Sequence, residues 1–416
     1  MRKITFILLL YFAISLSACG DIAYKEASTA YSKGDYSTAF QKFKKAADWN
    51  HRQAQYYLGF MYANGQGVAK NYSEAIKWYR LAGEKGDERA MTNLGYIFGA
   101  GLGVAQDYSE ALKWYRQATE KGDARAMNNL GAMYQHGHGV AQNYSEAVKW
   151  YRLSAEKDEI SAFYNLGFMY ANGQGVALDY SEALKLYRQA AEKGDARAMN
   201  NLGVMHQNGQ GAVKNYSEAL KWYQLAAEKG ETVAMGNLGY MYVNGLGVAQ
   251  DYPAAAKWYR LAAEKGDQNA MNNLGLLYED GQGVTQDYSE ALKWYRLAAE
   301  KGYASAMTNL GYMYDKGKGV PQDFTEAAKW YLSAAEKGEA FALITLGEKY
   351  ENGQGVIQDY AKAYMFFYLA GSFFKKNEDQ KTAKKNQDRI EKILSPEQIA
   401  KAQKMAGDWK LNNEPK

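Results

Sequence analysis

The sequence is short of the residues that support cross-links, metal sites and disordered linkers. It contains one cysteine, four histidines and four prolines in 416 residues. A single thiol cannot pair within the chain, so a disulfide framework is excluded. Disordered chains lack aromatic residues, whereas this chain has 36 tyrosines. The formal net charge is only +4, which gives no electrostatic reason to expect a nucleic-acid partner.

Long apolar runs are also missing, apart from one near the N-terminus. Residues 4–14 follow two basic residues and are too few to span a bilayer, and such a start is typical of a secretory signal. The only cysteine, Cys19, follows Leu-Ser-Ala, which resembles a bacterial lipobox. The resemblance implies that residues 1–18 are a lipoprotein signal peptide and that Cys19 is lipidated. Gly20 then favours the periplasmic face of the outer membrane. The alternatives are an ordinary signal peptide and a cytosolic start.

One phrase recurs along most of the chain without a change of spacing. The aromatic residue of Asn/Asp-Tyr-Ser-Glu-Ala stands at Tyr72 and again 36 residues later at Tyr108. Leu-Gly, as at Leu94-Gly95, and a Gly-x-Gly-Val phrase keep the same register. A fixed period of this length predicts a repeat architecture. The other copies of the aromatic position are Tyr36, Tyr144, Tyr180, Tyr216, Tyr252, Tyr288, Phe324 and Tyr360.

Each period predicts two helices. Asp87 can cap a first helix that runs to about Gly99 and buries an apolar stripe around Leu94. Asp107 can cap a second helix, with Glu110 reaching back in a capping box, and a glycine after the helix supplies its left-handed end. The Gly-x-Gly phrase lacks the third glycine and the Gly-Lys-Ser/Thr of phosphate-binding loops, so we expect a connection between helices. Two short helices cannot bury their stripes alone, so neighbouring hairpins must stack.

These motifs carry a family resemblance. Leu-Gly-x-x-Tyr in the first helix and Ala-x-x-x-Tyr-x-x-Ala in the second resemble the tetratricopeptide pattern. With the 36-residue period and the Gly-x-Gly-Val loop, the chain is similar to the Sel-one-like repeat family over nine units, residues 51–374. The resemblance implies an all-α fold, a right-handed α/α superhelix of helical hairpins. Residues 19–50 then form the lipidated N-terminus and a capping hairpin, and residues 375–416 form a C-terminal helical cap and tail, with a helix beginning at Ser395.

Motifs for catalysis and metal binding are weak. His136 and His138 share a loop, but sister repeats have Asn and Gln at these places and no further ligand completes a set. Some cysteine-rich relatives in the family are associated with β-lactam hydrolysis, and Ser-x-x-Lys begins here at Ser154 and Ser372. Neither Ser-Asp-Asn nor Lys-Thr-Gly is present. We therefore expect no catalytic residue, no metal and no cofactor, and a protein that is not an enzyme.

The first helices provide the candidate binding surface, because in tetratricopeptide-like superhelices they line the concave groove. The side of the helical wheel opposite Leu94 bears Arg89, Thr92 and Tyr96. Acidic residues take over towards the C-terminus, at Glu279, Asp315, Glu348 and Glu351, and this polarity would orient an extended ligand. The predicted basic and aromatic groove residues are Arg89, Tyr96, Arg125, Phe168, Arg197, Tyr240 and Tyr312.

A row of asparagines precedes the Leu-Gly phrase. Asparagine is a mediocre helix former, so its recurrence in the middle of a helix needs a cause. Either each amide bonds to the neighbouring hairpin or the row faces a ligand, and both can hold. In tetratricopeptide domains the matching asparagine contacts peptide backbone or a terminal carboxylate. The row consists of Asn93, Asn129, Asn165, Asn201, Asn237, Asn273 and Asn309.

Taken together, these features predict a monomeric envelope scaffold or adaptor. It would hold a protein or extended peptide segment in the groove and meet the membrane only through its N-terminal lipid. A glycan- or cell-wall-binding protein is the alternative, because exposed aromatic residues also suit sugars. Two further interpretations are that the groove is only a solvated helix face, and that the protein is a β-lactamase-like hydrolase.

Overall fold

The computed structural model describes residues 19–373 and 378–413, and the predicted signal peptide lies outside them. All regular secondary structure in the described chain is helical, beginning with a helix at residues 19–32. The helices that follow are α2 (Tyr36–Asp48), α3 (Arg52–Asn64), α4 (Tyr72–Glu84), α5 (Glu88–Ala100), α6 (Tyr108–Glu120), α7 (Ala124–His136), α8 (Tyr144–Ala155), α9 (Ile160–Asn172), α10 (Tyr180–Glu192), α11 (Ala196–Asn208), α12 (Tyr216–Glu228), α13 (Thr232–Asn244), α14 (Tyr252–Glu264), α15 (Gln268–Asp280), α16 (Tyr288–Glu300), α17 (Ala304–Lys316), α18 (Phe324–Glu336), α19 (Ala340–Asn352), α20 (Tyr360–Phe373), α21 (Glu378–Glu391) and α22 (Pro396–Asn413).

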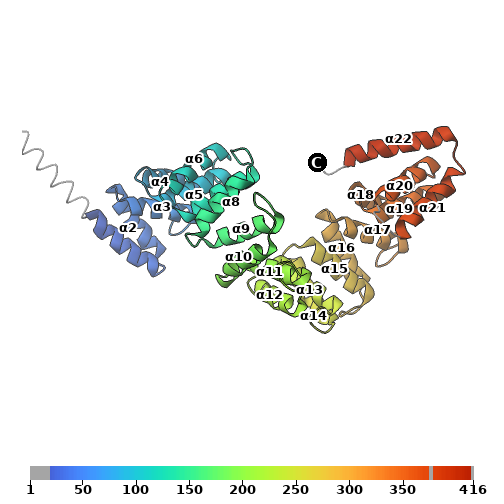
Figure 1. The fold of residues 1–416 in the computed structure, drawn as a ribbon, viewed down its shortest axis with the longest axis horizontal. Coiled ribbons are helices and arrows are strands. Elements are labelled where there is room, and N and C mark those ends of the chain that lie inside the picture. Colours follow the sequence, from blue (N-terminus) through green and yellow to red (C-terminus); the bar gives the residue numbers. More distant parts are fainter. Residues whose placement is uncertain (1–18, 374–377, 414–416) are drawn as a thin grey trace, which may run out of the picture. The chain divides into compact units, whose positions relative to one another are not determined.

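The chain divides into two compact units. The N-terminal unit runs to Met205 and includes Gly209–Val213, and the C-terminal unit comprises His206–Asn208 and the chain from Lys214 onward. Within each unit, odd- and even-numbered helices pair as hairpins, such as α5 with α6 and α15 with α16, and each hairpin packs on the next (Figure 1). The predicted fold class, an all-α stack of hairpins of the α/α superhelix type, is confirmed.

Local signals set the helix ends largely as predicted. The carboxylate of Asp107 accepts hydrogen bonds from the backbone N–H groups of Ser109 and Glu110, both at 2.9 Å. The predicted capping box is wrong in one detail, because Glu110 accepts the indole N–H of Trp114 at 2.8 Å instead of reaching back. Gly122 ends the second helix with φ of +87°, a conformation that costs glycine little.

The glycines of the repeat permit close approaches between helices. A Cβ on Gly95 would lie 2.5 Å from the ring of Tyr115 on the paired helix. A Cβ on Gly139, the second glycine of a Gly-x-Gly loop, would lie 2.8 Å from the carbonyl oxygen of Tyr108 in the preceding repeat, and its φ is +70°. Both distances are too short for a larger residue, so the Leu-Gly and Gly-x-Gly phrases are explained by packing.

Helices outside the matched repeats pack on the first and the last repeat. Phe43 of α2 is fully buried. It belongs to one hydrophobic cluster with Ala27 of the helix at residues 19–32 and Leu58 of α3. At the other end, α22 begins with a reciprocal cap, in which Gln398 N–H donates to Ser395 Oγ and Ser395 N–H donates to Gln398 Oε1. Trp409 meets Phe366 edge to face at 5.4 Å. Helix α21, which sequence reasoning did not predict, packs on α20. Among the described helices, none has the length and apolar character needed to cross a membrane.

Candidate functional site

The predicted groove residues all lie on first helices of hairpins. In the N-terminal unit they lie on α5, α7, α9 and α11, and in the C-terminal unit on α13, α15 and α17. Tyr96 and Tyr240 are 59% and 48% exposed, and Arg125 and Arg197 are exposed. Phe168 and Tyr312 are half-buried, as is every asparagine of the row. The predicted residues therefore share one side of the first helices within each unit.

Four asparagines of the row have a structural partner in the preceding hairpin. Each amide lies close enough to the hydroxyl of a tyrosine, buried on the second helix of the repeat before it, to lower the pKa of that hydroxyl by hydrogen bonding. Burial raises the pKa of these tyrosines far above its ordinary value, so the hydroxyls stay protonated. The pairs are Asn93 with Tyr79, Asn129 with Tyr115, Asn201 with Tyr187 and Asn273 with Tyr259.

In other repeats the equivalent tyrosine is satisfied within its own hairpin. The hydroxyl of Tyr151 donates to Gln135 Oε1 at 2.6 Å, and that of Tyr295 donates to Glu279 Oε2 at 2.8 Å. Tyr223 likewise bonds to Gln207, at 2.9 Å.

One position explains this alternation. The partner residue lies sixteen positions before the tyrosine, and this place is apolar in the four repeats that use asparagine. The apolar residues there are Ala63, Gly99, Ala171 and Val243.

Where the tyrosine hydroxyl bonds within its own hairpin, the asparagine of the next repeat bonds to the first helix of that hairpin. Asn165 Nδ2 donates to Asn128 Oδ1 at 2.8 Å, and Asn309 Nδ2 donates to Asn272 Oδ1 at 2.9 Å. The structure thus gives the row a role in joining hairpins. An amide offers two donors and an acceptor with two lone pairs, so these contacts leave capacity for a ligand.

Two of the predicted arginines stack on tyrosines. The guanidinium of Arg89 lies 4.1 Å from the ring centre of Tyr56, and that of Arg197 lies 4.2 Å from the ring centre of Tyr164. Each arginine also forms an ion pair with the aspartate two residues before it. The nitrogen–oxygen distance is 2.9 Å from Arg89 to Asp87 and 2.7 Å from Arg197 to Asp195. Sequence analysis did not select Tyr56 and Tyr164 as groove residues, although they occupy the position in their repeats that Thr92 occupies in its own.

A hollow of about 230 Å³ brings two predicted residues together in the N-terminal unit. Tyr96 and Asn129 both line it, and the small residues Gly99 and Ala132 leave the space open. His138 lies at its edge, stacked on the Tyr108 ring with centres 4.4 Å apart. In the described part of the chain, no three His, Cys, Asp or Glu side chains are grouped as metal ligands.

The predicted acidic end of the groove requires a correction. Glu279 and Asp315 are only 9% and 8% exposed. Glu279 pairs with Lys318 at 2.9 Å, and Asp315 pairs with Lys349, which is itself buried. These carboxylates link successive hairpins and do not face a ligand, because a buried charge must be paired.

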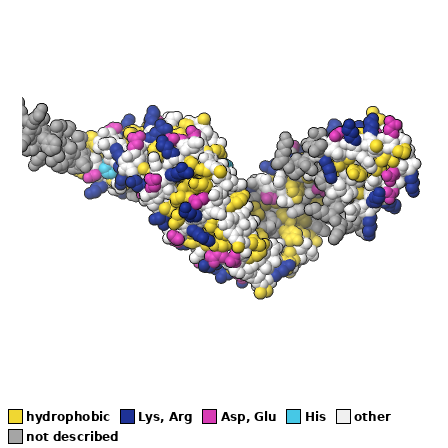
Figure 2. Space-filling model, turned by 45° about the horizontal axis from the view of Figure 1, so that its top comes forward, with side chains coloured by type: hydrophobic (Ala, Val, Ile, Leu, Met, Phe, Trp, Pro, Cys, Tyr) yellow, Lys and Arg dark blue, Asp and Glu magenta, His cyan; other side chains and the backbone are white. Residues whose placement is uncertain are grey.

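Glu351 follows the same pattern as the buried acids. It binds Arg389 of α21 through two contacts, at 2.8 and 2.5 Å. Glu348 remains exposed. Its carboxyl group is nevertheless partly desolvated, and this desolvation together with the nearby Glu351 carboxylate raises its pKa. Basic and acidic side chains are interspersed with hydrophobic ones on the face that Figure 2 shows.

The serine considered for catalysis is not accessible. Ser154 is fully buried, and its hydroxyl donates to the carbonyl of Ala124 at 2.6 Å. The second Ser-x-x-Lys phrase begins at Ser372, and its lysine lies outside the described residues. Cys19, the predicted lipidation site, is exposed.

Comparison with known proteins identifies the repeat. The Sel1 repeat model matches residues 52–87, 88–123, 124–159, 160–195, 196–231, 232–267, 268–303, 304–339 and 340–372. A search among curated proteins finds no match.

Two solved structures are similar over most of the chain. One is c5321, a protective antigen of uropathogenic Escherichia coli strains with an SLR fold. It is 35% identical, with a TM-score of 0.74, over 95% of this chain and 84% of that one. The other is a Sel1 repeat protein from Oxalobacter formigenes. It is 30% identical, with a TM-score of 0.58, over 74% of this chain and 90% of that one. Neither description names an enzymatic activity. Since consecutive repeat matches cover far more than half of its length, the chain belongs to the Sel1 repeat family.

Proposed function

We propose that the protein is an envelope adaptor whose N-terminal unit binds an extended, acidic protein segment. The proposed surface, here called the arginine face, consists of Arg89, Arg125 and Arg197 with Tyr56 and Tyr164. The observation that supports it best is the stacking of Arg89 and Arg197 on tyrosine rings. Stacking and the neighbouring aspartates fix the guanidinium groups in advance, so less side-chain entropy is lost when a carboxylate binds.

The chemistry of the arginine face suits a carboxylate-rich segment. Arg125 is exposed on α7, between the two stacked arginines in the chain, and no described carboxylate forms an ion pair with it. A guanidinium has five N–H donors in a fixed plane and can hold a carboxylate through two bonds. Tyr96 adds an exposed ring beside the hollow that Asn129 lines, and aromatic residues with arginine are enriched where partners bind tightly.

The location of the adaptor rests on the N-terminus. Lipidation of Cys19 would place the repeats at the periplasmic face of the outer membrane, because the attached acyl chains supply the membrane affinity. The exposure of Cys19 supports this part of the proposal. In that position the arginine face would bind other envelope proteins.

A labelled acidic peptide tests the proposal directly. The probe is a fluorescein-labelled decapeptide of alternating Glu and Ala, with alternating Lys and Ala as its counterpart, and binding is followed by fluorescence anisotropy. Arg125→Glu should weaken binding of the acidic peptide more than tenfold, equal to about 1.4 kcal/mol. Arg188→Glu makes the same charge change at an exposed position of the second helix α10, and it should leave binding unchanged.

Two results would contradict the arginine face. One is equal binding of the acidic and basic peptides, and the other is an equal loss in the Arg125 and Arg188 variants. A neutral oligosaccharide that binds at this face in place of the peptide would favour the glycan-binding alternative. Because the contact is electrostatic, the affinity for the acidic peptide should also fall as salt is raised.

A further inference from the structure

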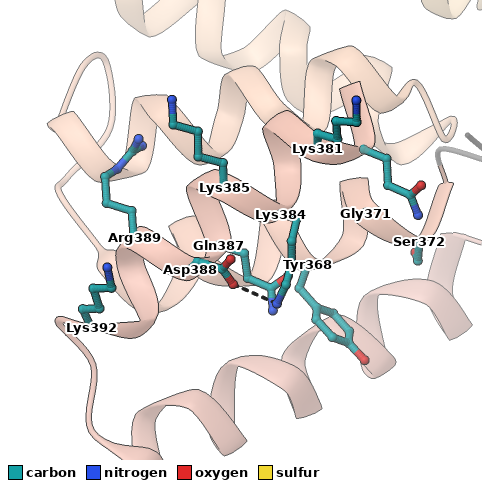
Figure 3. A pocket seen from close by; sticks show the side chains of 11 residues that line it. Tyr368, Gly371, Ser372, Lys381, Lys384, Lys385, Gln387, Asp388, Arg389 and Lys392 are labelled. Carbon is teal, nitrogen blue, oxygen red and sulfur yellow. Dashed lines mark ion pairs between the residues drawn. The ribbon is translucent and has the colours of Figure 1, made fainter. Parts of the chain in front are cut away.

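A basic cavity lies near the C-terminal end of the chain, far along the sequence from the arginine face. It has a volume of about 920 Å³ and lies between α20 and α21. Figure 3 shows Arg389 and Lys392 at one end of it and Ser372 at the other. Small-molecule sites in proteins have volumes of about 300–1,000 Å³, so this cavity is large enough for a ligand of several rings. The basic residues that line it are Lys381, Lys384, Lys385, Arg389 and Lys392.

Among the described lining residues, the positive charges outnumber the acids that could neutralise them. Asp388, the one acidic residue in that described lining, pairs with Lys384 at 2.8 Å. Arg389 is held by Glu351 of α19. Within the described residues, Lys385 and Lys392 form no ion pair with a carboxylate, and both are exposed. Two cations are therefore available to a ligand with at least two negative charges.

The cavity also contains a fixed aromatic ring. Tyr368 is 42% exposed, and its ring stacks on Tyr364 with an angle of 14° between the planes. The hydroxyl of Tyr364 accepts hydrogen bonds from Gln387 at 3.0 Å and from Gln403 of α22 at 3.3 Å. Tyr364 is thus held from two helices, and the Tyr368 ring lies nearly parallel to it with ring centres 6.3 Å apart.

Neutral polar groups complete the lining. The hydroxyl of Ser372 donates to the carbonyl of Leu369 at 2.7 Å, which leaves its oxygen free to accept a hydrogen bond. Gln380 adds an amide that can donate and accept. Hydroxyl and amide groups beside an aromatic ring match the hydroxyl-rich edges and apolar faces of a sugar, whereas lysines match its acidic substituents.

From this combination we propose that the cavity binds an acidic oligosaccharide, with carboxylate groups near Lys385 and Lys392 and a sugar ring on Tyr368. A single inorganic phosphate would use the cations but leave most of the volume and the ring uncontacted. An acidic peptide would satisfy the lysines without needing the Tyr368 ring. The site belongs to the C-terminal unit and is independent of the arginine face.

The experiment uses tetragalacturonate as the probe, titrated into the folded protein by isothermal titration calorimetry. Maltotetraose is the neutral counterpart of the same size, and inorganic phosphate and an octaglutamate peptide are the competing anions. We expect saturable binding of tetragalacturonate, no heat from maltotetraose, and binding of phosphate and octaglutamate at least tenfold weaker. Lys385→Glu combined with Lys392→Glu should weaken binding of tetragalacturonate more than tenfold.

Matched variants separate the site from general charge. Lys401→Glu with Lys404→Glu makes the same charge change at exposed positions of α22, outside the cavity, and should leave the affinity within twofold. Tyr368→Ala should weaken binding about tenfold, while Tyr368→Phe should retain it because the ring remains. Equal effects of the two lysine pairs, an unaffected Tyr368→Ala variant, or octaglutamate binding as tightly as tetragalacturonate would each overturn the proposal. Failure here would leave the peptide assay at Arg125 unaffected.

Discussion

Removal of the Asn129 amide should expose how the asparagine row joins one repeat to the next. Tyr115 is only 6% exposed, and the Asn129 amide of the following repeat lies close enough to its hydroxyl to lower the pKa by hydrogen bonding. The place sixteen residues earlier is Gly99, which has no side chain to take over. In Asn129→Ala the tyrosine hydroxyl therefore loses its protein partner in a buried setting.

The size of the effect follows from that loss. A buried polar group without a partner costs about 1–3 kcal/mol, whereas removal of both partners is nearly neutral. Asn129→Ala should thus lower the free energy of unfolding by about 1–3 kcal/mol. In a Tyr115→Phe background the same substitution should cost less, because no hydroxyl is stranded. The coupling energy between the two sites should be about 1 kcal/mol.

A matched pair one repeat further on provides the control. Tyr151 is also buried, but its hydroxyl donates to Gln135 of its own hairpin. Asn165, at the place equivalent to Asn129, donates to Asn128 instead. The Tyr151→Phe and Asn165→Ala changes should therefore be additive within about 0.3–0.5 kcal/mol.

The assay is urea unfolding of the full chain, followed by far-UV circular dichroism and tryptophan fluorescence. Hydrogen exchange in α6 and α7 should accompany it, because a repeat contacts only its neighbours and can open locally. Additive effects at Tyr115 and Asn129, or coupling as strong at Tyr151 and Asn165, would refute the reasoning from the alternating partners.

Three further predictions concern the ends of the chain. Cys19→Ser should abolish acylation and release the protein from the outer-membrane fraction; metabolic labelling with a fatty acid checks this, and a substituted protein that is still acylated would exclude Cys19 as the anchor. His51 caps α3 by accepting a hydrogen bond from the backbone N–H of Ala54, and burial lowers the pKa of its imidazole. The stability that this cap adds should be fully present above pH about 6.5, the ordinary histidine pKa. It should be lost as the pH falls through the lowered pKa of the folded state. Urea midpoints between pH 8 and 5 measure this loss, which His51→Asn should reduce because asparagine caps without titrating there; equal pH profiles would contradict the assignment. Deletion of residues 395–416 should uncover Phe366 and Tyr364, lower thermal stability and promote association in light scattering, while deletion of residues 414–416 should do neither; a truncated protein that stays monomeric and equally stable would show that α22 does not protect this end.

Much of the architecture is determined by the sequence alone, because its causes are local and repeated. The 36-residue period gives the number and order of the matched hairpins. Aspartates such as Asp107 set helix starts through backbone bonds two and three residues away. Glycines such as Gly122 set helix ends through their own φ angles. Each of these signals can be recognised within a few residues of its effect, and repetition makes it stand out.

Only the tertiary structure decides which polar side chains are free. Asn129 and Asn165 are equivalent in sequence, yet one satisfies a buried tyrosine and the other an asparagine, because Gly99 and Gln135 differ on the facing helix. Glu279 was expected to face a ligand, but Lys318, 39 residues away, buries and neutralises it. The basic cavity depends on α21, which has no repeat to reveal it. These outcomes depend on partners in neighbouring hairpins, and the spacing along one helix does not specify which partner a side chain will meet.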